Sequence, residues 1–592
     1  MSEMNEGFFE DAIVTGVLSE RHCQWHGRRA VCNWLGGCAY KLTTVSSPPQ
    51  RLIPINDHEL SAVCQAKLTL CIDQVTNEFP NSPTRKRTRH QVSLPFSSTA
   101  LPPPSFPTRP GSSTLGQVTS IDMLPDEVLL AIFGFCVVPA AKDQNTKKGI
   151  EAWQLLVHVC RRWRSIVFGS PRHLNLRLVS TERTSVRNTL DVWPPFPLVI
   201  RGNLTGVDCS NIVVVLERRD RVDEIDLWQV NSSALENVLA VMQKPFPALK
   251  DLRLSSHEEM VPVLPGLFLG GSAPSLLFLE LYGIPFPGLP NLLLSATRLV
   301  NLQLWNIPHS GYISPDTVVT ALSTLTSLQS FILRFRSHRS HPDLAIRRLP
   351  PPTRSVLLVL TYFSFKGVCE YLDDFVAFID TPRLHELSIT FFNDIIFDIP
   401  QLIQFISRTP TLKPLENAHV VFGGCEASIN FSSVSSRTPG DRSLKVGISC
   451  RELDWQVSSL EQICTPCLSL LSTLENLYIH EDLSSSSHPH WQHNIIENML
   501  WLELLRSFTT MKNLYLSEKF ARRIVPALRE PVESRTTEVL PILQNIFLEK
   551  VKQSEPVLEG IQQFVAMRQV TGHRISVSYW RRDRRFPFPR GE

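Results

Sequence analysis

The stretch PSLLFLEL, residues Pro274–Leu281, decides the fold, because its pattern returns along the chain. From Leu276 onward it reads apolar, two free positions, apolar, one free position, apolar. This alternation is typical of a short strand that is buried on one face. Seven further segments share the pattern: PALKDLRL, TRLVNLQL, TSLQSFIL, TPRLHELSI, STLENLYI, TTMKNLYL and LPILQNIFL. The pattern therefore predicts a repeated strand.

The spacing of these segments indicates a repeat architecture. Four successive copies begin 23–29 residues apart, at Leu249, Leu276, Leu299 and Leu328. Helix-like sequence lies between copies, as in LDDFVAFID, QLIQFIS and IIENMLWLELLRSF. A strand–helix unit cannot bury its apolar face alone, so copies stack into a curved solenoid with a parallel sheet. We expect an α/β fold with an irregular leucine-rich-repeat solenoid over 171–592, interrupted by a polar insertion between Leu412 and Leu474.

Strand alternation also predicts which side chains leave the core, because neighbours along a strand point to opposite faces. The expected core positions are Leu281, Leu304, Ile479 and Leu516. The residues expected on the concave face are Arg253, Glu280, Tyr282, Gln303, Trp305, Arg334, Tyr478, His480, Tyr515, Phe547 and Glu549. Aromatic residues and Arg often dominate protein–protein contacts. We therefore assign substrate binding to Tyr282, Trp305, Tyr478 and Tyr515; the alternative is that several of these residues pack under neighbouring loops.

A different pattern precedes the repeats, in LPDEVLLAIFGFC, Leu124–Cys136. Pro125 suits a first helical position, and Asp126 and Glu127 suit the positive end of the helix dipole. Two apolar stripes follow at helical spacing: Leu124, Val128, Ile132 and Phe135, and Leu129, Phe133 and Cys136. A second helix, also apolar on more than one face, is predicted in EAWQLLVHVCRRWRSIVF. Such a pair could form an ordinary core, but a partner protein would explain the second face.

These residues resemble the F-box, whose pattern runs Leu-Pro-x-Glu-hydrophobic and, after a gap, Val-Cys-Lys/Arg-x-Trp. The matching residues are Leu124-Pro125-Asp126-Glu127-Val128-Leu129, Ile132, Val157, Val159-Cys160-Arg161-Arg162-Trp163 and Ile166-Val167. A polar insertion near 142–149 lengthens the usual gap. The resemblance covers residues 119–170 and implies a short helical domain that docks on a Skp-family adaptor and so joins a cullin ligase core. It implies adaptor contacts at Leu124, Pro125, Val128, Ile132, Val157 and Trp163.

Together the two regions look like an F-box protein of the fungal type with C-terminal leucine-rich repeats. The expected function is then the substrate-recognition subunit of a Skp-cullin-F-box type ubiquitin ligase that holds an unknown protein substrate. The alternative is a non-catalytic leucine-rich-repeat scaffold whose F-box-like helices only cap the solenoid.

Composition limits the partners and the compartment. The 592 residues exceed a single compact core, and a net charge of +3 gives no strong attraction to nucleic acid. No apolar run is long enough for a membrane span, and the start of the chain is acidic. Thirteen scattered cysteines fit a reducing compartment. We expect a cytoplasmic or nuclear protein, with RKRTRH (85–90) either an import signal or a solvated basic patch.

The first part of the chain gives weaker signals. Residues 1–76 carry apolar runs without a clear period, which predicts a weakly structured segment. Residues 77–118 are rich in Pro, Ser and Arg, which predicts a disordered linker.

Candidate metal and catalytic residues do not form complete sets. Cys23, His26, Cys32 and Cys38 lack the usual paired spacing, and the CTPC pair, Cys464 and Cys467, has no second pair nearby. No phosphate-binding loop, serine nucleophile elbow or zinc-protease helix occurs in a fitting context. We therefore expect no bound metal, no cofactor and no enzymatic activity, and a metal-dependent enzyme is the least favoured class.

Overall fold

The structure is a computed structural model of the chain. It describes residues 34–35, 38–39, 121–137, 152–183, 190–206, 208–337, 353–392, 399–412, 415–433, 442–465, 473–482, 497–529, 539–549 and 555–581. The segments expected to be weakly structured (1–76) and disordered (77–118) thus lie almost wholly outside the described residues, as does the basic cluster 85–90.

Two compact units divide the chain, Met1–Val63 and Cys64–Glu592. The described part of the first unit is one short antiparallel pair, β1 (Trp34–Leu35) with β2 (Cys38–Ala39). Every element described below belongs to the second unit.

The described part of the second unit begins with a helical segment. It contains η1 (Ile121–Met123), α2 (Asp126–Val137), α3 (Ala152–Leu156) and α4 (Arg161–Gly169). As predicted, α2 begins directly after Pro125, with acidic residues in its first turn. The prediction of one continuous second helix is wrong, because this segment forms two helices, α3 and α4. The break lies before Cys160, whose extended backbone and sulfur cap the start of α4.

A mostly parallel sheet of sixteen strands follows, in the order β20-β19-β18-β17-β14-β15-β16-β13-β11-β9-β8-β7-β6-β5-β4-β3. Its strands are β3 (Leu178–Ser180), β4 (Leu198–Asn203), β5 (Val222–Trp228), β6 (Asp251–Ser255), β7 (Phe278–Tyr282), β8 (Asn301–Ile307), β9 (Ser330–Phe335), β11 (Tyr362–Gly367), β13 (Glu386–Phe392), β14 (Asn417–Phe422), β15 (Ala427–Ser432), β16 (Ser443–Ser449), β17 (Asn476–Glu481), β18 (Asn513–Leu516), β19 (Asn545–Glu549) and β20 (Ser576–Trp580). The expected α/β class is confirmed. The sheet is open, with β3 and β20 at its edges.

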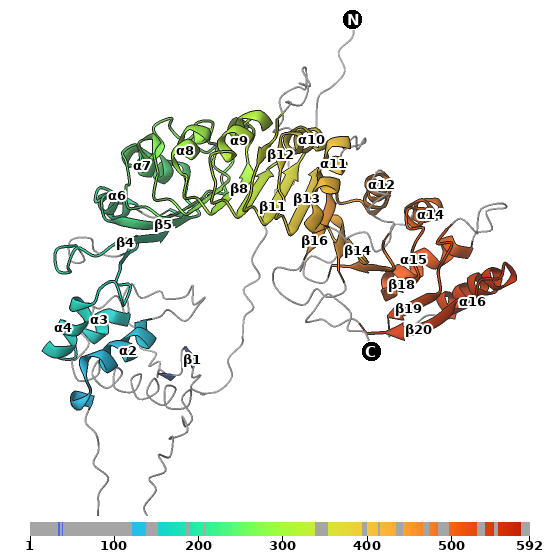
Figure 1. The fold of residues 1–592 in the computed structure, drawn as a ribbon, viewed down its shortest axis with the longest axis horizontal. Coiled ribbons are helices and arrows are strands. Elements are labelled where there is room, and N and C mark those ends of the chain that lie inside the picture. Colours follow the sequence, from blue (N-terminus) through green and yellow to red (C-terminus); the bar gives the residue numbers. More distant parts are fainter. Residues whose placement is uncertain are drawn as a thin grey trace, which may run out of the picture. The chain divides into compact units, whose positions relative to one another are not determined.

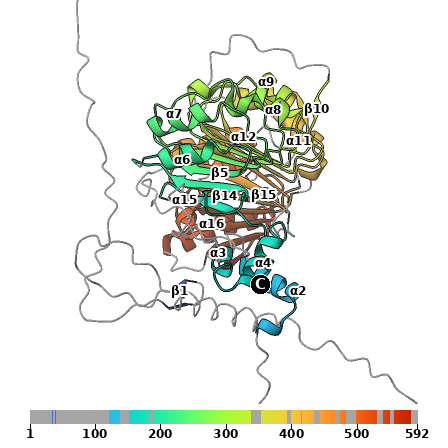
Figure 2. The same ribbon diagram turned by 90° about the vertical axis from the view of Figure 1, so that its left-hand side faces the viewer.

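Helices alternate with the strands along the chain and cover one face of the sheet (Figures 1 and 2). They are α6 (Ser210–Leu216), α7 (Ser232–Val241), α8 (Leu289–Ser295), α9 (Pro315–Leu322), α10 (Cys369–Ala377), α11 (Pro400–Arg408), α12 (Leu453–Cys464), α14 (Asn498–Arg506), α15 (Glu518–Arg529) and α16 (Glu555–Val570). Shorter elements are η2 (Phe268–Gly271), η3 (His309–Gly311), η5 (Pro410–Leu412) and a separate parallel pair, β10 (Ser355–Val356) with β12 (Ile379–Asp380). No helix within the described ranges combines the length and apolarity needed to cross a membrane.

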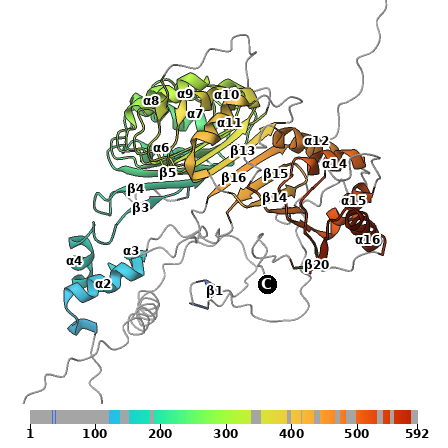
Figure 3. The ribbon, with the colours of Figure 1, turned by 45° about the vertical axis from the view of Figure 1, so that its right-hand side comes forward.

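The strand order reverses once, between β13 and β17. After β13 the chain forms β14, returns through antiparallel β15, and only then adds β16 beside β13. Figure 3 shows β13, β16, β15 and β14 side by side in this order. Strand β17 pairs with β14 on the other side. The prediction of a polar insertion between Leu412 and Leu474 is therefore wrong for the described parts of this segment. They hold three strands and α12, because alternating apolar residues such as Val420 and Ile429 are completely buried there.

The predicted register is confirmed. Leu281, Ile479 and Leu516 are fully buried, and Leu304 is 2% exposed. All eight copies of the sequence pattern contain a strand of the large sheet. Buried side chains of α2, α3 and α4 belong to the same hydrophobic cluster as those of the sheet, so residue 170 does not mark a break in the core.

Candidate functional site

The helix α2 has two apolar faces of different exposure. Leu129 and Phe133 are fully buried against the rest of the helical segment. Val128 is 42% exposed and Phe135 is 57% exposed, seven positions apart and so on one face of the helix. These two residues, with half-buried Leu124 and exposed Pro125, form what we call the α2 stripe.

The six residues expected to contact the adaptor fall into two groups. Pro125 and Val128 are exposed, and Leu124 is half-buried. The other three are core residues: Ile132 is 7% exposed, Val157 1% and Trp163 4%. Their assignment as contact residues is corrected, since in this structure they pack within the chain, with the Trp163 ring 4.8 Å from that of Phe133.

The two halves of the F-box-like motif meet in space. The Arg162 guanidinium donates to the Asp126 carboxylate from Nε at 2.9 Å and to the backbone carbonyl of Leu124 from Nη2 at 2.5 Å. One arginine thereby fixes the start of α2 against α4. The Cys160 sulfur accepts the backbone N–H of Trp163 at 3.5 Å, which gives this cysteine a capping role.

An aromatic cluster joins the helical segment to the first strands of the sheet. The Trp153 ring lies 5.1 Å from that of Trp193, 5.5 Å from Phe196 and 6.3 Å from Phe168. Its indole N–H donates to the backbone carbonyl of Arg177 at 3.0 Å, just before β3. The sequence stripes did not single out Trp153, because its partners come from a segment forty residues further on.

The sheet face turned away from the helices, here called the open face, carries the side chains that alternate with the core leucines. Along β4–β8 its middle row contains Arg201, Asp226, Arg253, Glu280 and Gln303, each paired in register with the next. Opposite charges thus face each other on neighbouring strands, an arrangement that stabilises a sheet by about 0.2–1 kcal/mol per pair.

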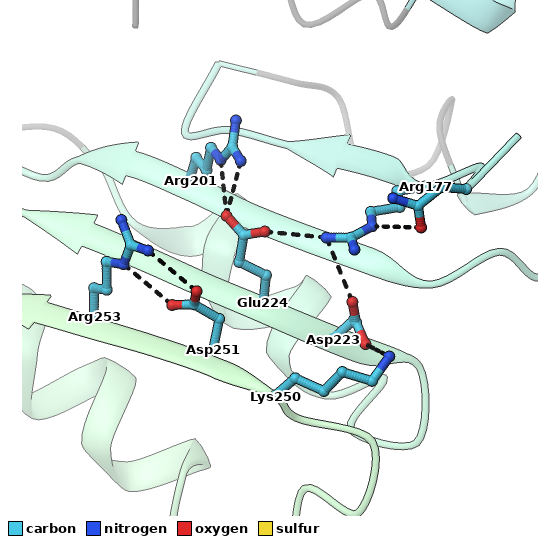
Figure 4. A network of polar contacts seen from close by, with 8 residues as sticks. Arg177, Arg201, Asp223, Glu224, Lys250, Asp251 and Arg253 are labelled. Atoms are coloured by element: carbon cyan, nitrogen blue, oxygen red, sulfur yellow. Dashed lines mark hydrogen bonds and ion pairs between the residues drawn. The ribbon is translucent and has the colours of Figure 1, made fainter. Parts of the chain in front are cut away.

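Ion pairs continue beside this row (Figure 4). The Glu224 carboxylate accepts from Arg201 at 2.8 Å and from Arg177 at 3.2 Å. Asp223 lies 2.7 Å from the Lys250 ammonium and 3.5 Å from Arg177. Both carboxylates are largely buried, so these pairs are screened less by salt than ordinary surface pairs.

Arg253 lies at the centre of the charged region. Its guanidinium makes two 3.1 Å bonds to the Asp251 carboxylate and lies 4.5 Å from the centre of the Phe278 ring. Burial raises the pKa of Asp251, Asp226 and Glu280, and the charge of Arg253 opposes that rise in all three. Arg253 thus stabilises the ionised forms of three neighbouring carboxylates.

The first two tentative substrate residues lie on the next row of the open face, paired in register. Tyr282 and Trp305 are both half-buried. The Tyr282 ring contacts that of His257 at 4.8 Å, and the Trp305 indole N–H donates to Gln303 at 3.1 Å. The Arg334 guanidinium covers the Trp305 ring, 4.5 Å from its centre.

The other two tentative residues belong to a stack of rings, the aromatic ladder, on β14, β17, β18 and β19. Ring centroids are 4.3 Å apart between His419 and Tyr478, 4.1 Å between Tyr478 and Tyr515, and 4.3 Å between Tyr515 and Phe547. Trp580 packs edge-on against both tyrosines. Burial raises the pKa of Tyr478 and of Tyr515 above the ordinary value of 10.

A row of asparagines, the amide ladder, runs beside the rings. Asn476 donates to Asn417 at 2.9 Å, Asn513 to Asn476 at 2.8 Å, and Asn545 to Asn513 at 2.7 Å. The half-buried amides of Asn476 and Asn513 thus each donate to one neighbouring strand and accept from the other. The sequence signal is the Asn at the second free position of the strand pattern, directly before LYI, LYL and IFL.

The aromatic ladder changes the interpretation of Tyr478. Tyr282, Trp305 and Tyr515 keep part of their surface open, whereas Tyr478 is only 8% exposed and His480 only 4%. The prediction that these two residues of β17 lie on the surface is therefore wrong, because both are buried. Rings on both neighbouring strands and Trp580 cover Tyr478, and their positions depend on pairings between distant segments.

Cysteines in the described residues lie in apolar surroundings or at the surface. Cys464 is buried at the end of α12, while Cys467, Cys23, His26 and Cys32 lie outside the described residues, as does the side chain of Cys38. Within the described ranges, no three His, Cys, Asp or Glu side chains are grouped to hold a metal ion.

Comparison with known proteins gives no family assignment: no family model matches the chain, and no curated protein matches it. The fold therefore defines the class only coarsely, as a mixed α/β protein in which strand–helix units extend one mostly parallel sheet.

Proposed function

We propose that the chain is the substrate-recognition subunit of a Skp-cullin-F-box type ubiquitin ligase. In this proposal residues 119–170 are the F-box and bind a Skp-family adaptor, and residues 171–592 are a leucine-rich-repeat solenoid that holds a protein substrate. The subunit performs no chemistry itself. It contributes proximity, because a substrate held near the transferred ubiquitin reacts at a high effective concentration. Such a ligase subunit would work in the cytoplasm or the nucleus.

The observation that carries the proposal is the α2 stripe. A short helix with one face fully buried needs no second apolar face, yet Val128 and Phe135 are about half exposed. Large apolar side chains exposed two turns apart on one helix face are the pattern of a helix that docks into a partner's groove. Arg162 holds this helix in place through Asp126, so the surface is preorganised for binding.

A second candidate function is supported by the aromatic cluster around Trp153. Its packing against Trp193 and Phe196 covers the β3 end of the sheet, which is the role of a capping unit in a repeat array. The chain would then be a scaffold whose helices protect the sheet edge.

Adaptor binding separates the two. The full chain is mixed with a purified Skp-family adaptor, and the dissociation constant is measured by biolayer interferometry. Replacing Pro125 and Val128 together by Ala should weaken binding roughly thirtyfold, since loss of a buried anchor costs about 2 kcal/mol. Val570→Ala, at an exposed valine at the end of α16, is the matched control. If the wild-type chain does not bind, the capping role stands alone.

A further inference from the structure

The pattern of charged side chains on the open face changes between β8 and β11. On β4–β7, cations and carboxylates alternate across neighbouring strands. On β9 and β11 the paired residues are Arg334 and Lys366, two cations at the same register. Like charges directly opposite each other destabilise a sheet, so this pair costs stability where the neighbouring strands gain it.

Neutral groups hold these cations in place. Arg334 donates to the Ser364 hydroxyl from Nε at 3.2 Å and from Nη2 at 2.8 Å, and its plane covers the Trp305 ring. The Lys366 ammonium lies 5.7 Å from the centre of the Phe392 ring. Within the described ranges, neither side chain forms an ion pair.

A third cation lies at the same ends of the strands. Arg336 donates from Nη2 to the backbone carbonyl of Glu258 at 3.3 Å, and the same atom lies near Gly283, just after β7. Its Nε is buried without a hydrogen-bond partner among the described residues. Other cations of the open face differ: Lys445, for example, pairs with Glu426 at 2.8 Å.

We propose that Arg334, Arg336 and Lys366, beside Trp305, form a binding site for an acidic segment of the protein substrate, with Asp or Glu side chains as its ligands. The proposal rests on the proposed function, because it names the chemistry of the substrate which that function requires. Charge complementarity identifies the occupant. A carboxylate between Arg334 and Lys366 would relieve their repulsion, and the Arg334 guanidinium stacked on Trp305 is already oriented to donate to it.

A nucleic acid fits this surface less well. A phosphate backbone needs a long positive track, whereas the cations are three in number and the adjoining strands carry Asp226, Asp251 and Glu280. Beyond the site, these carboxylates would repel further phosphates. A short acidic peptide extends over fewer strands and avoids them.

The test measures peptide binding to the full chain by fluorescence anisotropy. The probe is a fluorescein-labelled eight-residue peptide of alternating Glu and Gly, compared with the same peptide carrying Gln in place of Glu. The Glu peptide should bind, and binding should weaken as sodium chloride rises. Arg334→Gln should weaken it about tenfold and Lys366→Gln about threefold. Lys445→Gln, at a cation of the same face that is already paired, should leave it unchanged.

Any of the following results would overturn the proposal: equal binding of the Glu and Gln peptides, equal losses for Lys366→Gln and Lys445→Gln, or preferential binding of a twelve-nucleotide oligothymidine. Binding of a phosphoserine peptide alone would also overturn it, since the ligand would then be phosphate. An unfolding temperature of Lys366→Gln that is no lower than that of the wild-type chain excludes misfolding as the cause of lost binding. No adaptor enters this assay, so its failure is separate from a failure of adaptor binding.

Discussion

Strands β4–β7 and strands β17–β19 present the same face of one sheet with opposite chemistry. The first group carries charged side chains joined by ion pairs around Glu224 and Arg253. The second group carries stacked rings and a row of bonded amides. Both groups rest on the same buried leucine rows. The core pattern therefore sets the fold, while the alternate positions are free to adopt either chemistry.

The largest effects should be the same in both groups. Replacing Leu281 or Leu516 by Ala removes a fully buried side chain and should lower the free energy of unfolding by about 2–5 kcal/mol. Thermal unfolding followed by circular dichroism measures the change. The control is Leu294→Ala, at a half-exposed leucine of α8, which should have little effect. A stable Leu281 variant beside an unfolded Tyr282 variant would mean that the register is wrong by one residue.

A smaller effect should distinguish the two groups. Tyr515 is stacked between two rings, so Tyr515→Ala should cost about 2 kcal/mol, from two ring pairs of roughly 0.5–1.5 kcal/mol each and some lost burial. Tyr282 contacts one ring, that of His257, so Tyr282→Ala should cost less than about 1 kcal/mol. Tyr478→Ala should also lower the free energy of unfolding, because Tyr478 is buried inside the same stack. Equal losses at Tyr515 and Tyr282 would contradict the contrast.

The smallest effect concerns pH and belongs to the charged group alone. Burial raises the pKa of Asp226 above its ordinary value of 3.8. The ionised carboxylate is thus less favourable in the folded chain than in the unfolded chain, and this cost is present above the raised pKa and vanishes as pH falls toward 3.8. Asp226→Asn should slightly raise the unfolding temperature at pH 7, and the gain should shrink toward pH 4. Exposed Asp191→Asn is the control, and a gain that grows on acidification would reverse the assigned sign.

Much of the fold could be predicted from local sequence. The pattern of Leu276, Leu279 and Leu281 has the period of a half-buried strand, and each of its eight copies lies in the sheet. Strands β14–β16 could not be predicted in this way, because NAHVVF, ASINFS and SLKVGIS lack the leucine pattern. Their order depends on pairings between distant residues, which no local window contains.

The candidate site could also be predicted only as far as local sequence patterns allow. Alternation correctly placed Trp305 and Tyr515 outside the leucine core. It could not show that His419 and Trp580 would bury Tyr478, since these rings come from strands far apart in the chain. Likewise, the helical stripes of α2 identified two apolar faces, but only the packing of α3 and α4 decides that Ile132 is buried and Val128 exposed.

The reversed order around β15 has a consequence for synthesis of the chain. Strand β13 ends at Phe392, and its partner β16 begins only at Ser443. At about 5–20 residues per second, the ribosome needs several seconds to supply that partner. During this interval β13 presents unpaired backbone groups and an apolar face to the cell, which is the state that invites aggregation. Nascent chains that end between β13 and β16 should therefore depend most strongly on chaperones.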